Sequence, residues 1–171
     1  MTTILLGNTG FIGKSIAKVF DEYDKSYIGV NSKDFNLLTE QNLSNIISKN
    51  SSVIMTMGIK KQYGDHLENW CKNESILRNF IFAIIKSKPK HVIYFSSAAI
   101  YGEDIEFKNK ICETSPVNLR TFYGISKFNS ETILRKICDD FSIPLISLRP
   151  PLIYGADDQS TGYGPTLFTT L

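Results

Sequence analysis

Histidine and cysteine are scarce in this sequence, with two histidines and three cysteines among 171 residues. Cys71, Cys112 and Cys138 are odd in number and far apart, and no C-x-x-C pair occurs. This pattern argues against a disulfide framework, and we expect reduced, mostly buried thiols. With only His66 and His91 besides, the sequence offers no spacing of metal ligands, so we expect no metal site.

A large charge of one sign is also lacking. Nineteen basic and seventeen acidic side chains leave a net charge of +2, which gives no reason to expect nucleic acid, an acidic substrate or a membrane surface as a partner. No apolar run is long enough to cross a bilayer, and the chain begins with a predicted strand rather than with a basic region and a cleavage site. We therefore expect a cytoplasmic protein. Its length and its 42% hydrophobic content suit one domain.

Three regularly spaced glycines occur near the N-terminus, where residues 3–13 read T-I-L-L-G-N-T-G-F-I-G. The apolar run before Gly7 predicts a buried strand, and the amphipathic stretch from Phe11 to Phe20 predicts a helix. Gly7 permits a tight turn, Gly10 lets a phosphate approach the backbone, and Gly13 lets the helix pack closely on the strand. An ordinary strand-to-helix connection is the alternative, since the spacing is G-x-x-G-x-x-G rather than G-x-G-x-x-G.

The N-terminus of that helix would offer free N–H groups to the pyrophosphate of a dinucleotide. The cofactor contacts predicted for this segment are Gly7, Asn8, Thr9, Gly10, Phe11, Ile12 and Gly13.

Apolar runs and amphipathic stretches alternate along the rest of the chain. Further strands are predicted at 26–30, 53–55, 91–95 and 143–148, and further helices at 39–47, 64–88 and 121–139. Helices between parallel strands imply right-handed crossovers. We therefore expect an α/β fold with a doubly wound, Rossmann-like parallel sheet, three α/β/α layers and the strand order 3-2-1-4-5.

The ribose of a dinucleotide should arrive where the second strand ends, at Asn31, Ser32, Lys33 and Asp34. An acid at this place accepts from the 2′-OH of NAD, whereas a cation accommodates the 2′-phosphate of NADP. Asn31 and Ser32 are neutral and Lys33 is basic, which favours NADP, although Asp34 could act as the acid and favour NAD. A plain polar turn is the alternative for Lys33 and Asp34. The third strand ends at Met57 and Gly58, which we also predict to contact the cofactor.

Hydroxyl groups and a lysine follow the fourth strand. The strand leads into F-S-S-A-A-I-Y-G, and Tyr123 and Lys127 lie four residues apart on the next helix, hence on one face. A phenol with an ordinary pKa of about 10 is a poor base, but an ammonium group and an oxidised nicotinamide beside it would stabilise the phenolate. We predict Tyr123 as proton carrier, Lys127 as its activator and Ser97 as a hydrogen-bond partner of the same substrate oxygen during hydride transfer. Alone, Y-x-x-x-K also occurs on solvated helix faces.

Together these motifs resemble the extended short-chain dehydrogenases/reductases of the NAD(P)-dependent epimerase/dehydratase family, which act on nucleotide sugars. The resemblance implies that Ser97, Tyr123 and Lys127 form the catalytic triad and that the segment from Pro150 to Ile153 lies beside the nicotinamide. The matching positions are G-N-T-G-F-I-G, Asn73, F-S-S-A-A-I-Y-G, Glu113, Pro116, Y-G-I-S-K, Glu131, Leu148, Arg149, Pro150, Tyr154 and Gly155. Simpler alternatives stay open for two of them: Arg149 could only brace a loop, and Asn73 could only cap or pair within its helix.

Two departures from the family pattern refine the expected activity. Ala98 and Ala99 occupy the places where the dehydratases of this family carry an Asp-Glu pair, which favours an epimerase or keto-reductase over a dehydratase. Family members also continue into a C-terminal lobe that binds the sugar nucleotide. We therefore expect residues 1–171 to form an NAD(P)-binding Rossmann-like domain that ends early, without that lobe. A cofactor-binding regulatory or scaffold protein without turnover is the alternative.

The helices at 64–88 and 121–139 carry more apolar residues than one sheet face needs. In the resembling family such helices pair across a two-fold axis, so a homodimer is expected. The apolar residues noted on the second helix are Phe122, Ile125, Phe128, Ile133, Leu134 and Ile137.

Overall fold

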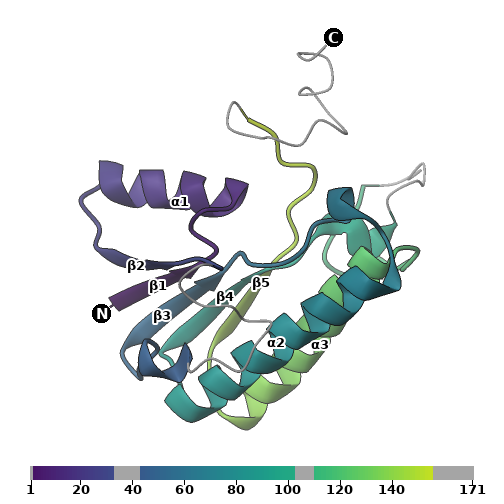
Figure 1. The fold of residues 1–171 in the computed structure, drawn as a ribbon. Helices are drawn as coiled ribbons and strands as arrows, with labels where there is room; N and C mark the ends of the chain where they lie inside the picture. The colour runs from purple at the N-terminus through teal and green to yellow at the C-terminus, as the bar shows by residue number, and fades with distance from the viewer. Residues whose placement is uncertain (1, 33–42, 103–109, 156–171) are drawn as a thin grey trace.

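Five parallel strands form one sheet in the computed structural model, which describes residues 2–32, 43–102 and 110–155 (Figure 1). The strands are β1 (Thr2–Leu6), β2 (Tyr27–Val30), β3 (Ser51–Met55), β4 (His91–Phe95) and β5 (Leu145–Leu148). The α-helices are α1 (Phe11–Glu22), α2 (Leu67–Ser87) and α3 (Phe122–Asp140). Three short 3₁₀ helices are η1 (Leu43–Asn45), η2 (Lys61–Tyr63) and η3 (Ala98–Tyr101).

The strand order is β2-β1-β3-β4-β5, so the expected order 3-2-1-4-5 is wrong. β3 pairs with β1, with Leu5 opposite Ile54, instead of lying outside β2. All five residues of β3 are buried, which is typical of a strand inside a parallel sheet, whereas the edge strand β2 leaves Ile28 44% exposed. The expected order would have put the fully buried strand at the edge.

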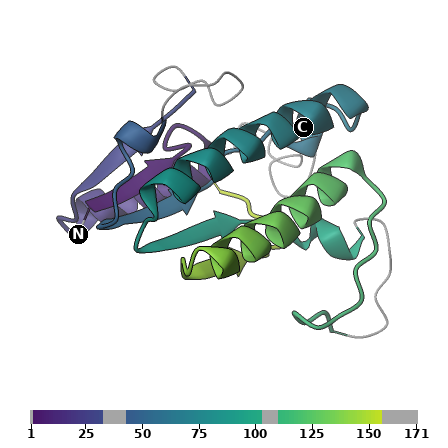
Figure 2. The ribbon, with the colours of Figure 1, turned by 90° about the horizontal axis from the view of Figure 1, so that it is seen from below.

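Helices cover both faces of the sheet, which confirms the three-layer arrangement. Figure 1 shows α1 on one face and α2 with α3 on the other, and Figure 2 shows α2 and α3 side by side. The main core lies between the sheet and this helix pair. It includes the register row Ile4, Val53 and Val92 from the strands, and Phe80, Ile84, Leu134 and Cys138 from the helices.

Most predicted elements begin and end within three residues of the observed bounds. Thr121 caps α3, because its Oγ1 accepts from the Gly124 N–H at 3.0 Å, and α2 ends at Ser87, with Lys88 as its C-cap residue just before Pro89. The helix expected at 39–47 is not formed beyond 3₁₀ helix η1 within the described residues, and positions 39–42 lie outside them. Among the described residues, no helix is long and apolar enough to cross a membrane.

Candidate functional site

The glycine loop after β1 is tightly folded. Gly7 adopts φ +91°, its N–H donates to the Val30 carbonyl at 2.7 Å, and its carbonyl accepts from the Gly10 N–H at 2.9 Å. A Cβ at Gly13 would lie 2.0 Å from the Gly7 oxygen, so only glycine lets α1 start this close to the strand. At Gly10 a Cβ would meet only that same oxygen, at 3.3 Å. The first turn of α1 has no side-chain cap from Gly10, so this cradle offers backbone N–H groups of the kind that bind phosphates.

The neighbouring loop residues differ in orientation. Asn8 lies against β2, since a Cβ at Gly29 would be 2.3 Å from Asn8 Nδ2, while Thr9 is exposed. Asn8 Oδ1 is a buried acceptor without a hydrogen-bond partner among the described residues. Asn31 and Ser32 follow β2 at the same edge of the sheet, whereas Lys33 and Asp34 lie outside the described residues.

The loop after β3 lies between the glycine loop and α3 and approaches both. Met57 approaches Gly7, where a Cβ would lie 3.1 Å from the Met57 Cγ, and a Cβ at Gly58 would lie 3.5 Å from Lys127 Nζ. Asn73 on α2 fixes this loop, because its Oδ1 accepts from the Ile59 N–H at 2.7 Å and its Nδ2 donates to the Ile59 carbonyl at 3.1 Å. Asn73 therefore pairs outside its helix, with a loop of the candidate site.

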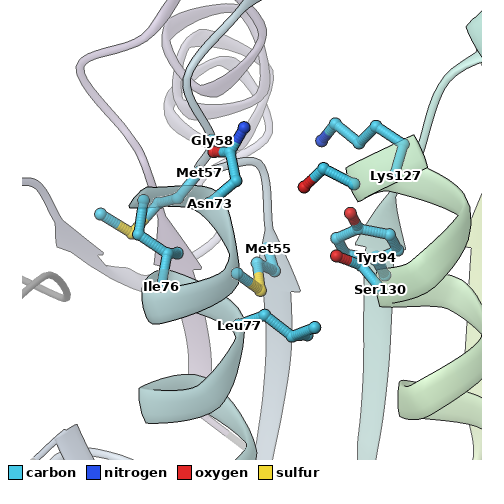
Figure 3. Close-up of a pocket in the computed structure, with 10 residues that line it drawn as sticks. Met55, Met57, Gly58, Asn73, Ile76, Leu77, Tyr94, Lys127 and Ser130 are labelled. Carbon is cyan, nitrogen blue, oxygen red and sulfur yellow. The ribbon is translucent and has the colours of Figure 1, made fainter. Parts of the chain in front are cut away.

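Lys127 occupies a buried position between α3 and β4 (Figure 3). The residue is 8% exposed, and Nζ donates to the Phe95 carbonyl at 2.8 Å. The same nitrogen lies 5.2 Å from the centre of the Tyr94 ring and 5.7 Å from that of the Tyr123 ring. Burial lowers the pKa of Lys127 from its ordinary 10.5 to about 8, and the carboxylate of Glu131 partly opposes that shift. Tyr94 was not predicted as a site residue. The only signal for it in the sequence is the alternation of side chains along the strand, which places Tyr94 on the sheet face opposite that of Phe95.

Ser97 and Tyr123 stand at the starts of two elements that pack together. Ser97 caps η3, accepting from the Ala99 N–H at 3.1 Å, and Tyr123 begins the first turn of α3. Gly124 permits the close approach, because a Cβ there would lie 3.0 Å from the Ala99 carbonyl oxygen. Asp65 from the loop before α2 also holds the start of α3, since its Oδ1 accepts from the Tyr123 N–H at 3.1 Å. Asp65 has no sequence signal beyond its place before a helix.

An ion pair between a partly buried arginine and a buried glutamate holds the segment after β5. Arg149 donates from Nε and Nη2 to both carboxylate oxygens of Glu131, which is 1% exposed, at 2.7–3.1 Å. Its Nη1 donates to the Tyr101 hydroxyl at 2.6 Å and to the Glu113 carbonyl at 3.0 Å. The bidentate pair raises the pKa of Arg149, which therefore stays charged. Of the alternatives for Arg149, these contacts support a bracing role.

The braced segment runs from the Ser97 side of the site toward the glycine loop. The Pro150 carbonyl accepts from the Ala98 N–H at 2.9 Å, and a Cβ at Gly155 would lie 3.3 Å from the Phe11 ring. Ile153 is partly buried between these two points. The structure thus brings the predicted positions of the loops after β1, β3, β4 and β5 to the carboxyl edge of one sheet, where α/β folds bind ligands.

The sequence of this chain matches a family model and a curated relative. The family model described as "NAD dependent epimerase/dehydratase family" matches residues 3–170. A curated relative, the ADP-L-glycero-D-manno-heptose-6-epimerase of Alkalilimnicola ehrlichii, is 31% identical over 101 residues, which cover 59% of this chain and 26% of the relative.

Two solved structures show the likeness in fold. A mutant of the UDP-glucuronic acid 4-epimerase from Bacillus cereus, in complex with a fluorinated UDP-sugar and NAD, gives a TM-score of 0.80 at 17% identity, covering 95% of this chain and 60% of that one. The UDP-glucose 4-epimerase of Thermus thermophilus, in complex with NAD, gives 0.74 at 18% identity, covering 87% and 54%. The chain thus spans a little over half the length of these structures. Because the family model matches nearly the whole sequence, the chain belongs to the NAD dependent epimerase/dehydratase family.

Proposed function

We propose that this protein is an NAD(P)-dependent epimerase or keto-reductase of nucleotide sugars, with residues 1–171 forming its dinucleotide-binding unit. The observation that carries the proposal is the buried Lys127 ammonium, held over the Tyr123 ring at the sheet edge that also bears the glycine loop. Family membership supports the reaction class, and the similar structures with NAD or UDP-sugars in their names support the ligand class.

The residues present fit a dinucleotide. The cradle of Gly7, Gly10 and Gly13 leaves space that a Cβ would fill, and its N–H groups suit a pyrophosphate. Met57, Gly58 and the segment from Pro150 to Ile153 would line the path from that cradle to Lys127. When bound, the dinucleotide supplies the chemistry of accepting and returning a hydride.

The chain's own residues would handle the proton. The Tyr123 phenol would hold or release it at the substrate oxygen, and the charged Lys127 would lower the pKa of that phenol. Ser97 already accepts a hydrogen bond from Ala99, so its O–H can donate to the same substrate oxygen. Lys127 would also contact the ribose. Ala98 and Ala99 supply no acid or base, which favours epimerisation or carbonyl reduction over elimination of water.

Fluorescence titration with NADPH and NADH tests the proposal most directly. We expect both to bind and NADPH to bind at least about tenfold more tightly, because a charge-assisted contact of Lys33 with the 2′-phosphate is worth about 1.5–3 kcal/mol. Lys33→Ala should remove most of that difference and leave NADH affinity nearly unchanged. If Asp34 instead accepts from the 2′-OH, NADH binds more tightly and Asp34→Ala erodes the preference. Binding of neither cofactor would refute the proposed function.

A further inference from the structure

Lys127 is buried as a cation without a carboxylate partner at ion-pair distance among the residues that the structure describes. Its hydrogen bond goes to a neutral group, the Phe95 carbonyl, at 2.8 Å. A buried ammonium loses its hydration and reverts to the neutral amine unless the protein replaces that hydration. Other groups of the protein must therefore keep this nitrogen protonated at neutral pH.

The nearest ring face belongs to Tyr94, not to the predicted proton carrier. Nζ lies 5.2 Å from the centre of the Tyr94 ring, within the range of about 6 Å at which cation–π attraction operates. Tyr94 is itself 3% exposed and fixed from several sides: it pairs with Met55 of β3 and Ser147 of β5, and its hydroxyl has a hydrogen bond with Ser130. The Tyr94 ring is therefore held in a fixed position beneath the Lys127 ammonium (Figure 3).

We propose that Tyr94 is a positioning residue whose ring keeps the Lys127 ammonium charged and directed toward Tyr123. This inference rests on the proposed function, in which a charged Lys127 acts on the Tyr123 phenol. A neutral ring attracts the cation without neutralising it, whereas a carboxylate in its place would form an ion pair and weaken the effect on Tyr123.

The other ionisable groups around this nitrogen come from all three neighbouring elements. Tyr123 and Glu131 belong to α3, Tyr94 belongs to β4, and Glu74 lies on α2, where it acts on Tyr94. Burial raises the pKa of the Tyr94 phenol, so its ring remains neutral throughout the range in which Lys127 titrates. The attraction of Lys127 to Tyr94 is therefore one of cation to ring, not of cation to phenolate.

The test is a pH titration of Lys127 by NMR in protein labelled with ¹³C at the lysine Cε, with the signal assigned by its loss in Lys127→Met. We expect a midpoint about 0.5–1 pH unit lower in Tyr94→Leu, and an unchanged midpoint in Tyr94→Phe, which keeps the ring. Phe80→Leu removes a fully buried ring of α2 that is not among the two rings described within cation–π range of Lys127, and it serves as the matched control. Its midpoint should equal that of the unmodified protein.

A second series keeps the shape of the core in case Tyr94→Leu does not fold. Phenylalanine and its trifluoro and pentafluoro analogues placed at position 94 fill the same space, but fluorination removes the negative charge from the ring face. The Lys127 midpoint should fall stepwise along this series, which a purely structural role of the ring does not predict. A constant or rising midpoint would overturn the proposal for Tyr94.

The titration uses the protein without cofactor, so it is independent of the proposed function. If NADH and NADPH bind the unmodified protein, both should bind more weakly to Tyr94→Leu than to Tyr94→Phe. If neither cofactor binds even the unmodified protein, the proposed function fails, while the Lys127 midpoints still decide on Tyr94.

Discussion

At the level of single residues, Lys127 combines a proposed role with a cost in stability. The pKa of Lys127 is about 8 in the folded protein and 10.5 in the unfolded chain. Between these pH values the unfolded state therefore binds more protons than the folded state. Stability therefore rises with pH across this window, and below pH 8 the folded state carries the full cost of burying the charge. Such a cost is typical of functional sites.

Substituting Lys127 by methionine should reveal that cost. We expect the free energy of unfolding of Lys127→Met, relative to the unmodified protein, to fall by about 2 kcal/mol between pH 7 and pH 9.5, because only the lysine protein gains from deprotonation. Urea denaturation at both values measures the difference. Lys86→Met, a change of an exposed lysine, should show no such dependence. A difference that stays constant with pH would contradict the buried charge.

Tyr123 is the residue whose substitution bears most directly on the reaction. Tyr123→Phe keeps the ring beside Lys127 and removes only the hydroxyl, so turnover should fall by about two to four orders of magnitude while cofactor affinity changes little. Turnover is measured on a panel of nucleotide sugars, the substrate class named under Proposed function. Tyr63→Phe, at an exposed tyrosine, is the matched control. A Tyr123→Phe protein with most of its rate would refute the assigned role.

At the level of elements, two glycines in the strand–turn–helix unit of β1 and α1 have different roles. Gly13 is required by packing, because a Cβ would lie 2.0 Å from a backbone oxygen, whereas Gly10 has space for a methyl group with only a 3.3 Å contact. Gly10 also has φ −76°, which alanine adopts readily. Its conservative replacement therefore tests ligand approach without testing the fold.

The two alanine variants should behave differently. Gly13→Ala should lower the free energy of unfolding by about 1–3 kcal/mol, because the helix must move away from the strand. Gly10→Ala should leave stability within about 0.5 kcal/mol and weaken NADH binding at least about tenfold, because the methyl group obstructs a phosphate at the cradle. Thermal unfolding and fluorescence titration measure the two effects. Unchanged NADH affinity in Gly10→Ala would contradict the assignment of pyrophosphate binding to this loop.

The sequence predicts these elements well because their signals are local. Apolar runs mark the strands, and Thr121 and Pro89 mark helix ends with their own side chains. The order of strands is a non-local property, since the predicted apolar run at 53–55 could pair with either neighbour, and only the complete burial of β3 shows that it lies inside the sheet. The hydrogen bond of Lys127 to the Phe95 carbonyl could not be predicted from the sequence either, because every residue type has a backbone carbonyl.

At the level of the whole molecule, the helix pair α2 and α3 has an inner and an outer side. Of the apolar residues expected to be surplus on α3, Leu134 is fully buried, and Ile133 and Ile137 pack against the core. Phe122 and Ile125 are exposed, each at 37%, and α2 adds Leu67 at 57% and Phe82 at 61%. The apolar surface available for a partner is therefore smaller than the sequence pattern indicated, yet it contains four large side chains.

We predict that these side chains support a homodimer through α2 and α3, as the family resemblance implies. Light scattering at micromolar concentration should give twice the chain mass of 19.3 kDa. Ile125→Asp should halve the observed mass while the circular dichroism spectrum is retained, because a charge at the centre of an apolar contact loses its hydration on association. The control is Ile146→Asp, which places the same charge at an exposed isoleucine of β5, and it should remain dimeric. A mass of 19.3 kDa for the unmodified protein would contradict the dimer, and a persistent dimer in Ile125→Asp would place the interface elsewhere.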